Sequence, residues 1–302
     1  MKEILAEKKD IIIETEENNS NNAEKKKSFT ILGISIWRLF AYFILYSIAG
    51  YIIETAFGAL TKGVIESRKS FLYGPFCAIY GLGAVVMILF LQYFKKNNFT
   101  LFFGGFFIGS VVEYIVSWVG EYFMHIKWWD YSNIPFNLNG RICVFFSLFW
   151  GILAIFLMSY FNPKMDHVID KIKRKIPHKL LKVLTATMII LMFLDFLVTG
   201  FALRMFFTRL VDTYHLELQN GDEYLFDCEK IYQNKQVSDF VYKYFSDEKM
   251  LKTFPNIKMT GKDGNIIYVS DILKNIQPYY FRIFTPRIPK LPEKDFSIQR
   301  QE

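Results

Sequence analysis

Five apolar blocks, each about twenty residues long or longer, constrain this sequence more than any other feature. An α-helix needs about 20 predominantly apolar residues to cross the hydrocarbon core of a bilayer. Backbone groups in that core must be hydrogen-bonded within the protein, so such blocks predict transmembrane helices. The expected spans are residues 36–60, 75–94, 99–124, 141–161 and 182–207. The predicted fold class is therefore all-α, a polytopic membrane helix bundle of about five transmembrane helices.

Polar segments flank this bundle, which is predicted to occupy residues 34–207. Residues 1–33 are mostly polar and charged and lack the apolar core of a signal peptide, so we expect a disordered polar N-terminal tail. From residue 208 onward charges are frequent, apolar runs are short, and prolines recur near the end. Residues 208–302 are therefore expected to form a small, mainly helical C-terminal appendage with an extended tail.

The segment between the fourth and fifth spans combines an apolar stripe with many lysines. This pattern predicts a basic amphipathic helix over residues 163–177 that lies in the membrane surface, and an ordinary solvated linker helix is the alternative. The chain carries 36 Lys and Arg against 29 Asp and Glu, a formal net charge of +7. Because the basic residues cluster beside the apolar blocks, the expected partner is a bilayer with anionic headgroups and not nucleic acid.

The same charge pattern predicts the orientation of the chain in a cell membrane. Lys and Arg near the span ends are more numerous on the side that carries the N-terminus, so this multi-pass protein is expected to have a cytoplasmic N-terminus. Cys77, Cys143 and Cys228 include no Cys-x-x-Cys pair, and their number is odd. We therefore expect neither a disulfide framework nor a zinc site, and the sequence indicates no metal and no cofactor.

Four carboxylates lie within the predicted spans: Glu54, Glu113, Glu121 and Asp195. Ionisable groups are rare inside membrane helices and mark functional sites there. The glutamates share helix faces with glycine and serine, which allow close helix packing. The functional interpretation is a proton, cation or substrate-amine site, and the structural alternative is an interhelical pair. Glu54 and Glu113 lie on these small-residue faces, which favours the functional interpretation for them. For Asp195 the structural interpretation is at least as good.

The connection between the third and fourth spans is chemically rich for a linker. Its candidate residues are Trp128, Trp129, Asp130, Tyr131, Asn137, Asn139, Gly140 and Arg141. Asp130 and Arg141 bracket this central loop and are expected to pair across it. The alternative is a belt of interfacial aromatic residues followed by a turn.

A second glycine-containing element lies at the entry to the second span and comprises Gly74, Pro75, Tyr80 and Gly81. Pro75 suits the first turn of a helix, so the span is expected to begin there. The chain contains no Gly-x4-Gly-Lys-[Ser/Thr] loop, no His-Glu-x-x-His and no Gly-x-Ser-x-Gly. It is therefore not expected to be an ATPase, a protease or a hydrolase.

Motifs in these regions resemble, in the same order, those of the CmpB-like integral membrane proteins, the "putative type IV ABC-transporter permease" family. The similar segments are Leu45–Thr55 (LYSIAGYIIET), Arg68–Gly81 (RKSFLYGPFCAIYG), Glu113-Tyr114, Trp128–Tyr131 (WWDY) and Phe136–Cys143 (FNLNGRIC). The chain departs from the family pattern at Lys69-Ser70, where Arg-Gly or similar is usual, and at Ala78, where proline is usual. The resemblance covers about residues 40–161.

The resemblance implies a transporter permease subunit that lacks its own ATPase and uses a separate nucleotide-binding ATPase subunit. Its substrate is not indicated, and a homo-oligomer remains an open alternative. A different hypothesis fits the same residues: a non-transporting cell-envelope membrane protein that binds lipid or a protein partner. In that case Glu54 and Glu113 would only join helices.

Overall fold

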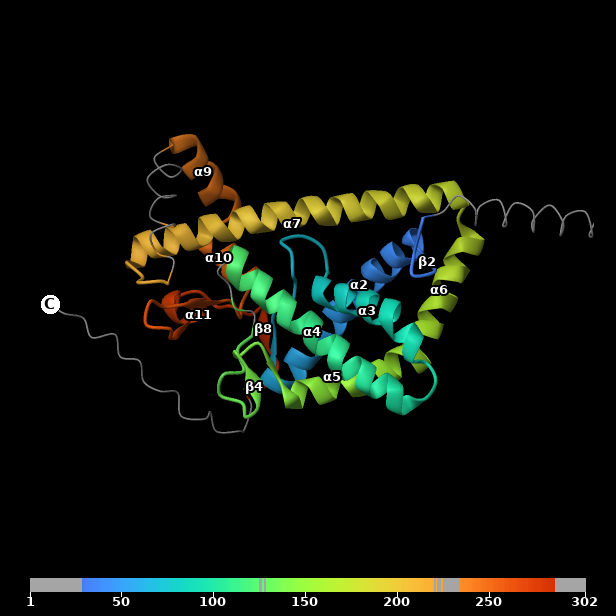
Figure 1. Ribbon diagram of the computed structural model, residues 1–302. Helices are drawn as coiled ribbons and strands as arrows, with labels where there is room; N and C mark the ends of the chain where they lie inside the picture. The colour runs from blue at the N-terminus through green and yellow to red at the C-terminus, as the bar shows by residue number, and fades with distance from the viewer. Residues whose placement is uncertain are drawn as a thin grey trace, which may run out of the picture. The chain divides into compact units, whose positions relative to one another are not determined.

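The structure of the protein is a computed structural model that describes residues 29–124, 127, 129–219, 221, 224 and 234–285. The parts of the two predicted tails at residues 1–28 and 286–302, and also Trp128 and Cys228, lie outside the described residues. The described chain is mainly helical (Figure 1). Its longer helices are α2 (Ile36–Lys62), α3 (Ala78–Leu91), α4 (Asn98–Met124), α5 (Val144–Phe156), α6 (Asn162–Lys175) and α7 (His178–Tyr214).

Four helices are long and apolar enough to cross a membrane. They are α2, α4, the continuous helix Val144–Lys175, and α7. The 27 residues of α2 extend about 40 Å at the standard helical rise, more than the hydrocarbon thickness. These helices confirm the predicted all-α membrane bundle.

The second expected span is shorter and begins later than its sequence suggests. Helix α3 and the following 3₁₀ turn η1 (Gln92–Phe94) together cover only Ala78–Phe94. Pro75 lies before the helix, because the chain there follows an irregular path in which Gly74 has a φ of +68°. The helix begins where the Ser70 hydroxyl accepts the Ala78 N–H at 2.9 Å.

The fourth expected span joins the predicted amphipathic helix without a break. A π-helical turn, η2 (Leu157–Phe161), connects α5 to α6. π-Turns interrupt the regular ladder and often produce kinks. Helix α6 runs at a steep angle from the end of α5 to the start of α7 (Figure 1).

The chain divides into two compact units. The first comprises the described parts of residues 1–45, 81–112 and 145–191. Small residues allow α4 and α5 to pack closely in it: a Cβ atom at Gly105 would lie 2.2 Å from the Ala154 Cβ. The Ser110 hydroxyl donates to the Ser147 hydroxyl at 2.7 Å. The hairpin of β1 (Thr30–Ile31) and β2 (Ile34–Ser35) precedes α2 in the same unit.

The second unit comprises the described parts of residues 46–80, 113–144 and 192–302. Its hydrophobic core forms around the C-terminal half of α7, where Phe206 and Leu210 are fully buried. This core includes side chains of α9 (Lys235–Tyr244), α10 (Asp247–Thr253), β6 (Lys258–Thr260) and α11 (Val269–Ile272). The C-terminal appendage therefore packs against the end of α7 in a shared hydrophobic core.

Short antiparallel strand pairs connect the polar segments of the second unit. β3 (Val64–Ile65) pairs with β8 (Phe281–Arg282), which links the first loop to the C-terminal appendage. β4 (Asn137–Leu138) pairs with β5 (Ile142–Cys143) within the central loop. β6 forms a hairpin with β7 (Ile266–Tyr268), so the appendage contains some strand as well as helix.

Candidate functional site

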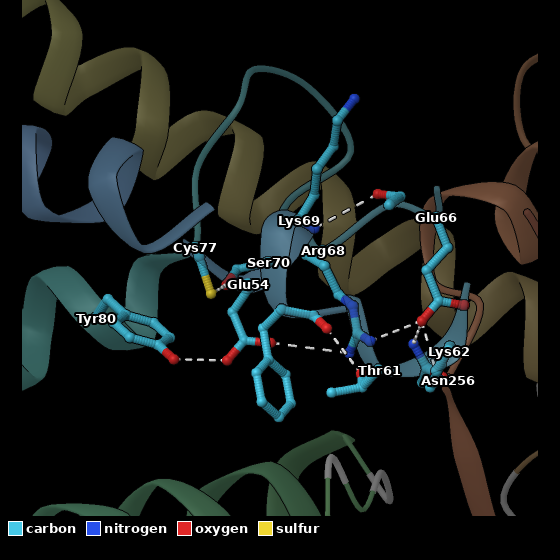
Figure 2. A network of polar contacts seen from close by, with 12 residues as sticks. Glu54, Thr61, Lys62, Glu66, Arg68, Lys69, Ser70, Cys77, Tyr80 and Asn256 are labelled. Carbon is cyan, nitrogen blue, oxygen red and sulfur yellow. Dashed lines mark hydrogen bonds and ion pairs between the residues drawn. The ribbon is translucent and has the colours of Figure 1, made fainter. Parts of the chain in front are cut away.

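A chain of polar contacts begins where α2 and α3 lie against each other (Figure 2). The Tyr80 hydroxyl donates to Glu54 Oε1 at 2.5 Å. The two helices can approach here because Gly50 has no side chain: a Cβ at that position would lie 2.4 Å from the Tyr80 Cβ and Cγ atoms. The glycine stripe predicted on the first span therefore serves to bring a tyrosine to the intramembrane carboxylate.

Arg68 joins Glu54 to a second, more deeply buried carboxylate. Its Nη1 lies 3.8 Å from Glu54 Oε2, and its Nη2 lies 2.7 Å from Glu66 Oε1. Only 6% of Glu66 is exposed. The guanidinium also lies beside Gly58, where a Cβ would be 2.8 Å from Nη2, so the glycine leaves room for the arginine.

The chain of contacts ends in the C-terminal appendage. Lys62 Nζ lies 2.9 Å from Glu66 Oε1 and donates to Asn256 Oδ1 at 2.6 Å. Asn256 Nδ2 donates to the same Glu66 oxygen at 3.1 Å. Two carboxylates thus meet two cations, so the network is charge-compensated, which lowers the cost of burying its members.

Glu113 forms a separate tyrosine–carboxylate pair. The Tyr131 hydroxyl donates to Glu113 Oε1 at 2.8 Å, and only 5% of Glu113 is exposed. Burial, followed by the negative charge of Glu113, raises the pKa of Tyr131 well above its ordinary value. Tyr131 is therefore a neutral hydrogen-bond donor throughout the physiological pH range.

The third carboxylate, Glu121, is the partner of Arg141. Arg141 Nη2 forms a short ion pair with Glu121 Oε2, and Lys127 Nζ lies 3.6 Å from Glu121 Oε1. The expected pairing of Asp130 with Arg141 is therefore wrong. Asp130 Oδ1 instead accepts hydrogen bonds from the Ser132 backbone N–H at 3.1 Å and the Ser132 hydroxyl at 2.6 Å.

The remaining predicted residues of the central loop fix its backbone. The Trp129 indole donates to the Arg141 carbonyl at 2.9 Å, and Asn137 Oδ1 accepts the Gly140 N–H at 3.0 Å. Gly140 has a φ of +66° and packs against Asp130 and Ser132, so a side chain there would be strained. Asn139 reaches the third span, because its Nδ2 donates to the Tyr114 hydroxyl at 3.0 Å.

Asp195 is an anchor for the segment before α3 and does not join the Glu54 network. Its two carboxylate oxygens accept the Tyr73 N–H at 3.3 and 3.1 Å. One turn later, the Thr199 hydroxyl accepts the Leu72 N–H at 2.9 Å. This supports the structural interpretation of Asp195.

The predicted candidates therefore separate into three contact groups, around Glu54, Glu113 and Glu121. Of the span-entry residues, Tyr80 joins the Glu54 group, Gly74 and Pro75 shape the preceding segment, and Gly81 is buried in α3. The sequence interpretation missed Lys62, Glu66, Arg68 and Asn256 as members of the network. No helical spacing signals these contacts, because α2 ends at Lys62 and Glu66 lies in the loop after it.

Among the described residues, no group of three or more His, Cys, Asp or Glu side chains could hold a metal ion. The chemistry of the three groups is therefore that of carboxylates held by tyrosine hydroxyls, arginines and lysines. Such groups can bind protons or cations, or can exchange partners when neighbouring helices move.

Comparison with known proteins agrees with the resemblance found in the sequence. Residues 41–200 match the model of the family described as "Putative ABC-transporter type IV". A comparison with curated proteins and one with solved structures each found no match. The match includes most of α2, all of α3 to α6, the central loop and the first part of α7. With its four membrane-capable helices and a match over more than half of its length, the chain belongs to the membrane-protein family described as "Putative ABC-transporter type IV".

Proposed function

We propose that the chain is the membrane-embedded permease subunit of an ABC-type transporter and works with a separately encoded nucleotide-binding ATPase subunit. Membership of the family supports a transport role. The sequence contains no phosphate-binding Gly-x4-Gly-Lys-[Ser/Thr] loop, which supports the use of a separate ATPase. On this proposal the chain itself is not an enzyme.

The observation that carries the proposal is the polar network of Tyr80, Glu54, Arg68 and Glu66. These residues come from two membrane helices and the loop between them, and all lie in the part of the chain that matches the family. Buried charges in membrane helices are costly and are retained along substrate or ion pathways. The 3.8 Å contact between Glu54 and Arg68 is also the longest in the network, so it is the contact that a substrate ammonium group would replace most easily.

The test begins with affinity purification of the tagged full-length chain from its natural host in a mild detergent. A nucleotide-binding protein should co-purify, and the complex should hydrolyse ATP after reconstitution into vesicles. Glu54→Gln keeps the shape of the side chain but removes its charge, so it should lower ATP hydrolysis without lowering expression. The matched control is Glu248→Gln, because Glu248 is exposed and pairs only locally with Lys252.

Repeated recovery of the chain without any nucleotide-binding protein would contradict the proposal. If an ATPase complex forms but Glu54→Gln and Glu248→Gln change its activity equally, the transport role would stand. The polar network around Glu54 would then have no part in that role.

A second candidate function is a non-transporting envelope protein that binds lipid or a protein partner. The C-terminal appendage favours it, because this region lies beyond the part of the chain that matches the family and packs into a hydrophobic core around the end of α7. Glu113→Gln distinguishes the two functions. A normal phenotype in a strain that carries this variant favours the envelope role, whereas loss of activity at normal expression favours transport.

A further inference from the structure

Helix α6 separates its acidic residues from its basic ones. Both of its aspartates are engaged within the first unit: Arg38 Nε lies 3.1 Å from Asp166, and Arg38 Nη2 donates to Asp170 at 3.1 Å. The Tyr42 hydroxyl also donates to Asp166 in a short hydrogen bond. On an adjoining face Ile169 is buried, with 4% exposed. Helix α6 therefore packs against the first unit through Asp166 and Ile169, whereas Asp170 and Val168 keep exposed surface.

The remaining face of α6 is basic and exposed. It consists of Lys164, Lys171, Arg174 and Lys175, which we call the basic face. Helical spacing brings these four residues to one side. Lys171, Arg174 and Lys175 form no ion pair with any residue that the structure describes, and the Lys164 ammonium lies 3.6 Å from the centre of the Tyr160 ring. The positive charge of this face is therefore largely uncompensated within the described chain.

The connections of α6 place this face beside the membrane. One end of α6 follows the apolar helix α5 through η2, and the other end is two residues from the start of α7. The candidate span Val144–Lys175 includes α6, but its apolar part is α5 with η2, and the charged residues of α6 form its C-terminal end. We therefore expect α6 to lie near the level where this helix and α7 leave the hydrocarbon. Basic clusters at such positions attract anionic lipids, at about 1 kcal/mol for each Lys or Arg near the surface.

We propose that the basic face of α6 is a binding site for the phosphodiester headgroups of anionic phospholipids. The aspartates of α6 are occupied by other partners: Arg38 pairs with Asp166 and Asp170, and Lys173 Nζ lies 3.8 Å from Asp170. They form no ion pair with Lys171, Arg174 or Lys175 in the described chain, so the charge of the basic face is available to an anionic ligand. A lipid is favoured over an acidic protein, since anionic headgroups are already concentrated at the level that α6 occupies. This inference does not depend on the proposed transport function.

The test uses the full-length protein purified in a neutral detergent. Its thermal unfolding is followed while phosphatidylglycerol or phosphatidylcholine is added to the micelles. Phosphatidylglycerol should stabilise the wild-type protein at a lower mole fraction than phosphatidylcholine does, and the difference should shrink at high salt. The triple variant Lys171→Gln/Arg174→Gln/Lys175→Gln should need at least about tenfold more phosphatidylglycerol to reach half of the stabilisation. If each of the three lost charges contributed fully, the increase would be on the order of 100-fold.

A matched triple variant controls for the loss of charge alone. Lys235, Lys262 and Lys274 are exposed residues of the C-terminal appendage, and changing all three to Gln removes the same charge from another surface. This control should respond to phosphatidylglycerol as the wild type does. Equal stabilisation of the wild type by both lipids, or equal losses in the two triple variants, would overturn the proposal. It would also fail if the α6 variant kept the full response to phosphatidylglycerol, or if an acidic protein but not the lipid bound in an α6-dependent manner.

Because all substituted side chains are exposed, both variants should unfold at the wild-type temperature in the absence of lipid. If the α6 variant does not, Lys171→Gln alone provides the comparison, with Lys262→Gln as its control. The single variant should need about fivefold more phosphatidylglycerol than its control.

Discussion

Tyr131 shows how a loop residue can hold a buried carboxylate of a membrane helix. Its hydroxyl lies 2.8 Å from Glu113, and Phe at this position would remove the donor while keeping the ring. Loss of one partner of a buried polar group costs about 1–3 kcal/mol. We therefore predict that Tyr131→Phe lowers the free energy of unfolding by about that amount, as measured by denaturation in detergent.

The pH dependence of this loss follows from the raised pKa of Tyr131. Below about pH 10, the ordinary tyrosine value, the hydroxyl is protonated in both folded and unfolded chains, so its contribution is constant. Above about pH 10 the unfolded chain ionises first, and the contribution is lost as the pH rises. The difference in the free energy of unfolding between wild type and Tyr131→Phe should thus be constant from about pH 6 to 9 and should become smaller above about pH 10. Tyr93→Phe, at an exposed tyrosine, should show no such difference.

Arg141 provides a second test at the level of single residues, because its partner is Glu121 and not Asp130. Both side chains are partly exposed, 17% for Arg141 and 24% for Glu121, which weakens the pair relative to a fully buried one. A double-mutant cycle of Arg141→Ala and Glu121→Ala should give a coupling energy of about 1–3 kcal/mol in unfolding measurements. The cycle of Arg141→Ala with Asp130→Ala should give less than half of that value. A larger coupling energy for Arg141 with Asp130 than for Arg141 with Glu121 would instead support the expected pair across the loop.

Among the helices, the contact between α4 and α5 depends most directly on a glycine. A Cβ at Gly105 would meet the Ala154 Cβ at 2.2 Å and the Trp150 carbonyl oxygen at 2.9 Å, and the backbone oxygen cannot rotate away. We therefore predict that Gly105→Ala separates the helices and costs about 1–3 kcal/mol, the usual cost of overpacking. The measurement is the unfolding temperature of the purified protein.

The same substitution at Gly83 is the control for Gly105→Ala. A Cβ at Gly83 would have no atom within 4 Å, so alanine fits there without displacement. Alanine favours a helix over glycine by up to about 1 kcal/mol. Gly83→Ala should therefore leave the unfolding temperature unchanged or raise it. Equal losses at both positions would mean that the contact with α5 does not explain the effect of Gly105→Ala.

How well the sequence predicted each element depended on whether its determinants were local. The lengths of α2 and α4 follow from apolar composition, which is visible in the local sequence. Helix α7 instead runs from His178 to Tyr214, beyond the expected span 182–207, because its C-terminal part is buried in the core of the second unit. The start of α3 depends on Ser70, eight residues earlier, and on the Ser47 carbonyl, which accepts the Cys77 N–H at 2.9 Å. No periodic pattern encodes such contacts, so the sequence placed this helix at Pro75.

The candidate site shows the same limit. Glu54 and Glu113 were identifiable because a carboxylate within an apolar helix is rare. Tyr80, the helical partner of Glu54, was also among the candidates, but two other partners come from loops: Tyr131 lies in the central loop, and Arg68 lies in the segment before α3. Charged residues in loops are common, so composition alone could not select Arg68 or Glu66 from their neighbours.

For the whole molecule, the contacts between loops constrain how many times the chain can cross the membrane. Strands β3 and β8 pair, so Ile65 and Phe281 must lie on the same side, because a β-ladder cannot form across a bilayer. An even number of crossings must therefore separate them. The four helices α3, α4, α5 and α7 satisfy this condition only if the short helix α3 crosses as well.

A contact in the first unit leads to the same conclusion. Gln92 Nε2, just after α3, donates to the Leu32 carbonyl before α2 at 2.9 Å. These residues should also share one side, which requires that α2 and α3 both cross or that neither does. Because α2 is long and apolar enough to cross, we predict that α3 crosses as well. Together the two contacts favour five crossings, which place the N- and C-terminal regions on opposite sides. The excess of Lys and Arg near the N-terminal side then favours a cytoplasmic N-terminus.

Single cysteines at three exposed sites, in a background lacking the native cysteines, test this topology. Thr30→Cys and Lys96→Cys should be protected from a membrane-impermeant thiol reagent in intact cells, and Lys262→Cys should be labelled. Labelling at Thr30 and Lys96 with protection at Lys262 would reverse the orientation but keep the five crossings. Protection at Thr30 with labelling at Lys96 would mean that α3 returns to the side from which it entered. That last result would also contradict the pairing of β3 with β8, because the two strands would then lie on opposite faces of the membrane.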